Sequence, residues 1–189
     1  MHAAPSRLLA ALRRARLPNP FRAAALLVGA ALAACAPGHD WRETRSADGA
    51  VGLLFPCRPL QHERNVPIAG ANRKLVLQSC EAGGQTWALA SADLVDPALL
   101  GAALDELARA AAANLGATPT TQGLQVPGAT PHPGSRRLAL VGRRPDGQAS
   151  QMHTALFAHG TRVYQATVLG EVAPADAVAV FFDSLRAGP

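Results

Sequence analysis

Residues 96–116, DPALLGAALDELARAAAANLG, mark the point where the alternating pattern of the preceding chain changes to a helical one. Asp96 is a favourable N-cap, Pro97 suits the first helical position, and Gly116 is a favourable C-cap. The apolar residues form one stripe at helical spacing, at Leu100, Leu104, Leu107, Ala111 and Leu115. This stretch therefore predicts one long amphipathic helix that packs its apolar stripe against a sheet.

Short runs of alternating or β-branched residues on both sides of this helix predict the strands of that sheet. Before the helix they cover residues 41–45, 50–55, 61–68, 73–80 and 86–92, an order typical of an antiparallel meander. After the helix they cover residues 137–141, 150–157 and 161–169. The Pro- and Gly-rich connection at residues 117–135 is long for a plain loop, so we expect a short strand near residues 124–126 within it.

The chain closes with a second helical pattern, which begins near Pro174. Its apolar face consists of Val178, Phe181, Phe182 and Leu185. The order of strands, helix, strands and helix predicts an α+β fold, in which a single antiparallel β-sheet is packed by two amphipathic helices. We expect one such domain over residues 41–189.

The N-terminal part of the chain has the features of an export signal. Arg22 is followed by an unbroken apolar run, residues 23–34, which is too short to span a bilayer as a helix but fits the apolar core of a signal peptide. The run ends in the sequence LAAC at residues 32–35, which resembles the lipobox of bacterial lipoproteins. An ordinary secretory leader with an incidental Cys is the alternative interpretation.

The lipobox resemblance implies that residues 1–34 are a cleaved signal peptide and that Cys35 is the lipidated first residue of the mature protein. Residues 35–40 then form the lipidated end and a short tether, which keeps the domain close to its membrane. Ala36 follows the Cys, and in Gram-negative lipoproteins a residue other than Asp at this position favours the outer membrane. We therefore expect a lipid-anchored protein on the periplasmic face of the outer membrane.

The basic charge of the whole chain comes from this leader. The sequence has 18 Lys and Arg against 13 Asp and Glu, and five of the Arg but no acidic residue precede Cys35. Residues 35–189 are therefore formally neutral, with 13 basic and 13 acidic residues. A nucleic acid or another polyanion is not expected as a partner.

The sequence after the leader resembles the PsbP-like domain, and it is also similar to lipoproteins of Gram-negative bacteria. The resemblance is carried by a strand ending in Phe55-Pro56, a meander, one long amphipathic helix, further strands, and a terminal helix ending FFDSL at residues 181–185. It implies a protein that binds or helps to assemble protein complexes and that has no shared catalytic motif.

Cys57 and Cys80 follow Cys35 and form a pair. In an exported protein such a pair predicts a disulfide bond. In a plain meander one strand would separate the two backbones by about 9.6 Å, whereas a disulfide spans about 6.8 Å at most. The bond then requires convergence beyond the strand ends or another strand order, and two free thiols are the alternative.

The sequence contains no catalytic or cofactor motif: no phosphate-binding loop, dinucleotide fingerprint, nucleophile elbow or zinc-protease motif. None of the five His after the leader is within four residues of another; they are His39, His62, His132, His153 and His159. His153 lies in a predicted strand and is the candidate for an unrecognised hydrolase, with a packed or solvated His as the alternative. Cys57, His62 and Cys80 would give three metal ligands, one fewer than a structural zinc site uses.

Two pairs of arginines flank the strand predicted at residues 137–141. Arg136-Arg137 and Arg143-Arg144 would form a basic patch for phosphate or lipid head groups, or they protect a solvated sheet edge by charge. Asp105 and Glu106 are adjacent, so on a helix they point about 100° apart and make no paired-carboxylate site.

These observations predict a non-enzymatic envelope lipoprotein, anchored in the membrane by the lipid on Cys35, that acts as a binding or assembly module for an envelope protein. No cofactor and no metal are expected. A binder of a small amphiphile or lipid is the second hypothesis, with residues 117–135 covering a cleft between sheet and helix. An unrecognised hydrolase is the third. A pocket large enough for a ligand would favour the second hypothesis, and a solid core with an exposed apolar patch the first.

Overall fold

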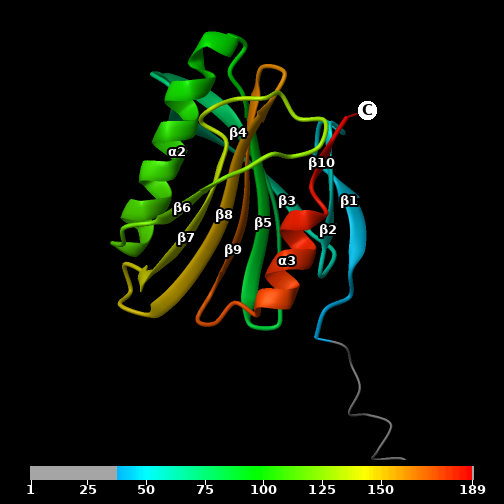
Figure 1. Cartoon of the computed structure of the whole chain (residues 1–189), viewed down its shortest axis with the longest axis vertical. Coiled ribbons are helices and arrows are strands. Elements are labelled where there is room, and N and C mark those ends of the chain that lie inside the picture. Colours follow the sequence, from blue (N-terminus) through cyan, green and yellow to red (C-terminus); the bar gives the residue numbers. More distant parts are fainter. Residues whose placement is uncertain (1–37, 189) are drawn as a thin grey trace, which may run out of the picture. The chain divides into compact units, whose positions relative to one another are not determined.

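The computed structural model describes residues 38–188, which form two antiparallel β-sheets and two α-helices (Figure 1). The predicted signal peptide, residues 1–34, and the predicted lipidation site at Cys35 lie outside the described residues. Within residues 38–188 no helix is long and apolar enough to cross a membrane.

The larger sheet has seven strands in the spatial order β3-β4-β5-β9-β8-β7-β6, and every neighbouring pair is antiparallel. The strands are β3 (Leu60–Ile68), β4 (Ala71–Ala82), β5 (Gln85–Asp93), β6 (Thr120–Gly123), β7 (Arg136–Arg143), β8 (Ala149–His159) and β9 (Arg162–Gly170). Except for β6, all of them lie close to their predicted bounds. β9 runs between β5 and β8, so the strands before and after the long helix join at the centre of one sheet.

A second sheet of three strands shows that the predicted fold class, a single sheet packed by two helices, is wrong. Its strands are β1 (Arg42–Arg45), β2 (Val51–Phe55) and β10 (Arg186–Ala187), in the order β1-β2-β10. β1 and β2 were predictable as strands, but an alternating pattern does not identify the strand with which each one pairs. Pro56 and Pro59 follow β2 and cannot donate to a ladder, so the chain leaves β2 and enters the other sheet at β3.

The long predicted helix is confirmed as α2 (Leu100–Leu115), which follows a short 3-10 helix, η2 (Pro97–Leu99). The Asp96 side chain accepts a hydrogen bond from the Ala98 N–H at 2.9 Å and thereby caps η2. Gly116 follows α2 with a φ of 56°, the left-handed conformation that glycine adopts without strain. The apolar stripe of α2 packs against one face of the large sheet at β7, β8 and β9.

The second predicted helix is confirmed as α3 (Ala175–Asp183), and it lies on the other face of the large sheet. In β8, Ala155 and Phe157 belong to the apolar cluster under α3, whereas Leu156 and Ala158 belong to the cluster under α2. Because side chains alternate along a strand, these two clusters lie on opposite faces of the sheet. The domain therefore has three layers: α2, the seven-stranded sheet, and α3 together with the three-stranded sheet (Figure 1).

Candidate ligand-binding site

A loop that leaves the sheet edge and returns to the same place forms the candidate site. Gly123 at the end of β6 and Arg136 at the start of β7 are register partners, so the intervening residues 124–135 form an Ω-loop. In Figure 1 this loop, drawn in yellow-green, runs from β6 across the sheet toward β10 and returns to β7. Loops of this kind often carry a function, because a rigid scaffold holds their two ends.

The short strand predicted near residues 124–126 is wrong in position, because the strand is β6, residues 120–123. β6 has the polar sequence TTQG and is exposed, so it lacks the apolar pattern from which strands are predicted. Leu124 and Val126 are apolar for a different reason: they pack from the loop into the cluster under α3.

Backbone hydrogen bonds fix the Ω-loop to two other parts of the domain. The Ala187 N–H in β10 donates to the Pro127 carbonyl at 2.8 Å. The Thr130 N–H donates to the Ala158 carbonyl at 3.0 Å, and the Gly160 N–H donates to the Thr130 hydroxyl at 3.0 Å. The loop is therefore held at β10 on one side and at the β8–β9 turn on the other.

Gly128 allows the loop to approach β10 this closely. Its φ is 79°, and a Cβ atom added at this position would lie 1.9 Å from the Ala187 carbonyl oxygen. No other residue fits here without moving either the loop or β10.

The Ω-loop surrounds a concavity of about 920 Å³, here called the loop pocket. This volume lies within the range of small-molecule sites. Its apolar lining includes Leu124, Val126, Ala129 and several prolines, together with Phe157 of β8. A few polar side chains, among them His132, also line it. An apolar wall with few polar groups suits a ligand that is itself largely apolar.

His132 contributes a hydrogen-bonding group to the loop pocket. Its Nδ1 atom accepts a hydrogen bond from the Gly134 N–H at 2.9 Å, which fixes the ring within the loop. In the neutral ring Nε2 then carries the proton and acts as a donor.

A second hollow of about 460 Å³ lies beside α3 and is here called the α3 groove. Register places Thr120, Ala139 and His153 in one row across β6, β7 and β8, and Gln122 and Arg137 in the next row. These side chains face the same side of the sheet as α3, and α3 closes the groove with residues such as Val178.

Arg137 has an unusual environment in the α3 groove. Its guanidinium carbon lies 4.4 Å from the centroid of the Phe182 ring, within the range of a cation–π contact. Among residues 38–188 it makes no salt bridge and no hydrogen bond through its side chain. The side chain is half-buried, so its charge is partly removed from water without a negative partner.

His153, the candidate for hydrolysis, also lies in the α3 groove. Burial, and then the positive charge of Arg137, lower the pKa of His153, so its ring is neutral at pH 7. The described residues that line the groove include no carboxylate to orient the imidazole and no Ser or Cys beside it. The neutral ring offers one hydrogen-bond donor and one acceptor to a bound molecule.

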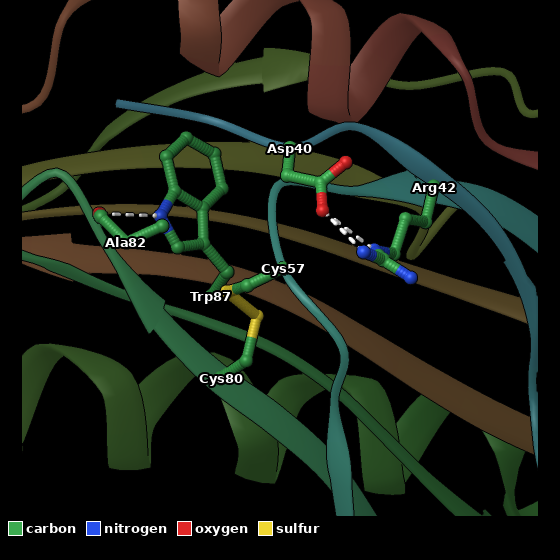
Figure 2. The surroundings of a disulfide bond; sticks show 6 residues. All are labelled: Asp40, Arg42, Cys57, Cys80, Ala82 and Trp87. Atoms are coloured by element: carbon green, nitrogen blue, oxygen red, sulfur yellow. Dashed lines mark hydrogen bonds and ion pairs between the residues drawn. A yellow bond between two sulfur atoms is a disulfide. The ribbon is translucent and has the colours of Figure 1, made fainter. Parts of the chain in front are cut away.

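The predicted disulfide between Cys57 and Cys80 is confirmed, with the two Cα atoms 6.0 Å apart (Figure 2). The strand order explains why the bond fits. β2 belongs to the small sheet, so Cys57 is not separated from β4 by an intervening strand. Leu60, soon after Cys57, pairs with Ser79, the residue before Cys80. Because both sulfurs are bonded to each other, Cys57, His62 and Cys80 do not form a metal site, and the described residues contain no other group of three or more potential ligands.

An aromatic cluster fixes the start of the described chain next to this disulfide. His39 stacks on Trp41 with 5.5 Å between the ring centroids, and the Trp41 ring meets Trp87 edge-on at 5.8 Å. The Trp87 indole N–H donates to the Ala82 carbonyl at 3.1 Å (Figure 2). Although His39 and Asp40 fall in the predicted tether, His39 packs on the domain, and the Asp40 N–H donates to the Pro56 carbonyl at 2.8 Å.

A partly exposed cluster of carboxylates joins the two sheets, and no local sequence pattern indicates it. Tyr164 of β9 donates to the Asp48 carboxylate at 2.6 Å, and Arg162 forms ion pairs with Asp48 and Asp93, each at 3.1 Å. Burial acts to raise the pKa of Asp48, but hydrogen bonds from Ser46 and Tyr164, with the charge of Arg162, outweigh it and lower the pKa. Burial and the neighbouring carboxylate raise the pKa of Tyr164, so its phenol stays protonated. This cluster ties the β1–β2 turn to the large sheet.

The two arginine pairs do not form one basic patch. Arg136 points to the α2 side, where it donates to the Leu104 carbonyl at 3.1 Å and pairs with Asp105 at 2.7 Å. Arg137, the next residue, lies on the opposite face in the α3 groove. Arg143 donates to the Gly147 carbonyl in the β7–β8 turn, where Arg144 pairs with Asp146.

The sequence matches no protein-family model and no curated protein. Its function is therefore inferred from the two hollows and from the groups that line them. The loop pocket supplies apolar surface, and the α3 groove supplies a cation and hydrogen-bonding groups.

Proposed function

We propose that this protein is a lipid-anchored envelope lipoprotein whose domain binds a small amphiphilic molecule without chemical change. The observation that carries this proposal is the loop pocket, an apolar concavity of about 920 Å³ within a loop that is hydrogen-bonded at both sides. Its volume lies in the range of small-ligand sites, and most of its lining is apolar with a few polar groups.

The same observation favours ligand binding over assembly with another protein. A docking protein is expected to expose a continuous apolar patch. The large exposed apolar side chains of residues 38–188 come from separate elements and turns; they are Leu60, Val95, Val141, Val172 and Val180. The loop pocket, in contrast, gathers apolar side chains around one hollow.

The membrane anchor in this proposal is the lipid on Cys35, supported by the signal-peptide pattern and the sequence LAAC at residues 32–35. Each buried methylene of a lipid chain contributes about 0.8 kcal/mol, so several chains hold a protein stably. His39 packs on the domain, so only three residues separate Cys35 from the first described contact. The domain would then lie close to the membrane surface.

The test is the binding of single-chain lipids to the mature protein. We would export the Cys35→Ser protein behind a cleavable leader, purify it without detergent, and titrate it with monoolein, oleate and oleoyl lysophosphatidic acid by calorimetry. The proposal expects saturable binding of at least one of the three at a ratio of one per chain. The absence of saturable binding for all three would contradict it.

A pocket-filling variant assigns the binding to the loop pocket. Ala129 lines the pocket, so Ala129→Phe should fill part of it and weaken binding at least about tenfold. Ala47→Phe adds the same volume to an exposed turn and serves as the matched control. Thermal unfolding of both variants shows whether the fold is retained. Equal binding by Ala129→Phe and wild type, with both folded, would place the ligand elsewhere.

A further inference from the structure

We propose that the ligand is an anionic amphiphile, whose carboxylate or phosphate binds Arg137 in the α3 groove while its apolar chain lies in the loop pocket. This inference rests on the proposed function and adds to it the chemical class of the ligand.

The positions of the two hollows along the strands support a single ligand. Ala155 is the register partner of Arg137 and lies between His153, which lines the α3 groove, and Phe157, which lines the loop pocket. These three β8 residues face the same side of the sheet, and successive ones are about 6.6 Å apart. Ser135 lines the loop pocket and is only two residues from Arg137. Arg137 therefore lies in the row of the α3 groove that is nearer to the loop pocket.

The charge of the residues that line the two hollows indicates which charge the head group of the ligand carries. Arg137 is the one Lys, Arg, Asp or Glu among the described residues that line either hollow. A half-buried cation loses part of its hydration, and no carboxylate in residues 38–188 pairs with Arg137 to replace it. Phe182 compensates for part of this loss, because its ring attracts the guanidinium. A bound anion would supply the missing negative charge.

The geometry of the groove suits an oxyanion with more than one oxygen. The Arg137 guanidinium lies over the Phe182 ring and makes no hydrogen bond within residues 38–188, so its N–H groups are available to a carboxylate or phosphate through two parallel hydrogen bonds. Gln122 and Thr120 line the same groove and carry further donors. His153 is neutral, so it adds a hydrogen-bond donor without changing the charge balance.

The experiment compares three lipids with the same acyl chain: monoolein, which is uncharged, oleate, which has a carboxylate, and oleoyl lysophosphatidic acid, which has a phosphate. The protein is the exported Cys35→Ser mature chain, and calorimetry gives the dissociation constants. Because hydrogen bonds between charged groups are the strong ones, we expect at least one anionic lipid to bind about tenfold or more tightly than monoolein. The tighter of the two anions identifies the head group.

Substitution of Arg137 separates this inference from the proposed function. Arg137→Gln should reduce the affinity for the anionic lipid to that for monoolein and leave monoolein binding unchanged. Arg137→Lys should retain part of the preference, since it keeps the charge but loses the planar fork. Arg143→Gln is the matched control, because Arg143 ends the same strand and lines neither hollow.

Two outcomes would overturn the inference. Equal affinity of the wild type for all three lipids would mean that the protein binds the acyl chain and does not discriminate between head groups. An anion preference that persists in Arg137→Gln, with the melting temperature unchanged, would place the anion site elsewhere. In both cases the proposed function would stand, whereas failure of all three lipids to bind would contradict the proposed function itself.

Discussion

Gly128 is the single residue on which the shape of the Ω-loop depends most directly. We expect Gly128→Ala to destabilise the domain by about 1–3 kcal/mol, because a Cβ at a φ of 79° is strained and would collide with the Ala187 carbonyl. Urea unfolding measures this change. Gly123→Ala is the control: nothing lies within 4 Å of an added Cβ, and its stability should stay close to wild type.

The disulfide between Cys57 and Cys80 is a second local feature that affects the stability of the domain. In the chain-entropy model, a disulfide between residues 23 apart in sequence raises the free energy of unfolding by about 3–4 kcal/mol. We therefore expect the Cys57→Ser, Cys80→Ser double variant, in the Cys35→Ser background, to unfold at lower urea concentration than its parent. Thiol titration of the unfolded, unreduced parent provides the control. No free thiol should be found, and two free thiols would contradict the disulfide bond.

The structural role of a single residue can be predicted where it depends only on residues close to it in the sequence. Gly116 caps the long helix as predicted, whereas Asp96 caps the short 3-10 helix that precedes it; both caps depend on the backbone within a few residues. In the sequence, Arg137 stands out only as one half of an arginine pair. Its role depends on the strand that places it opposite Ala155 and on Phe182, far away in the sequence, and no local pattern contains that information.

At the scale of elements, periodicity identified the helices and most strands but not their pairing. The alternation of β2 shows that one of its faces is buried, and Val51, Leu53 and Phe55 are indeed buried. It does not show that β2 pairs with β1 and β10 in a separate sheet, because the partner β10 is very short. The same limit explains β6, an exposed strand without apolar residues.

The carboxylate cluster that joins these elements predicts a pH dependence of stability. The pKa of Asp48 is lower in the folded protein than in the unfolded chain, so the ionised carboxylate stabilises the fold. This stabilisation is fully present above the ordinary Asp pKa of about 4, and it is lost as the pH falls through the pKa that Asp48 has in the folded protein. We expect Asp48→Asn to unfold more easily than wild type at pH 7, and the difference to shrink toward pH 2. Urea unfolding across this range measures it.

The control for this pH prediction is Asp176→Asn. Asp176 is exposed in the first turn of α3, away from the carboxylate cluster. This variant should follow the wild-type pH profile closely. A difference between wild type and Asp48→Asn that is constant from pH 7 to pH 2 would show that the carboxylate charge is not what stabilises this junction.

At the level of the whole domain, the described N-terminus and the Ω-loop, residues 124–135, lie toward opposite ends of the large sheet (Figure 1). His39 lies against Gly83 in the β4–β5 turn, next to the row in which Gln85 and Gly170 pair. Phe157 of the loop pocket lies six residues farther along β8 than Gln151, which also pairs with Gly170. Six strand residues span about 20 Å, so the pocket would face away from a membrane that holds the N-terminus.

The proposed lipid on Cys35 would hold the domain at the membrane. We expect the wild-type protein to label with palmitate and to sediment with membranes, and Cys35→Ser to do neither, because the substitution removes the thiol that would carry the lipid. Metabolic labelling and membrane fractionation measure both properties. A Cys35→Ser protein that still incorporates palmitate would contradict the anchor.

The pairing of β2 with β10 also has a kinetic consequence. Gly52 and Arg186 are register partners, although nearly the whole described chain lies between them. Contacts between residues so distant in sequence form slowly, because the entropy of closing the intervening chain opposes them. A ribosome completes β2 long before it completes β10, so the small sheet cannot close during most of synthesis. The small sheet therefore reaches its full set of strands only after the C-terminal residues have been synthesised.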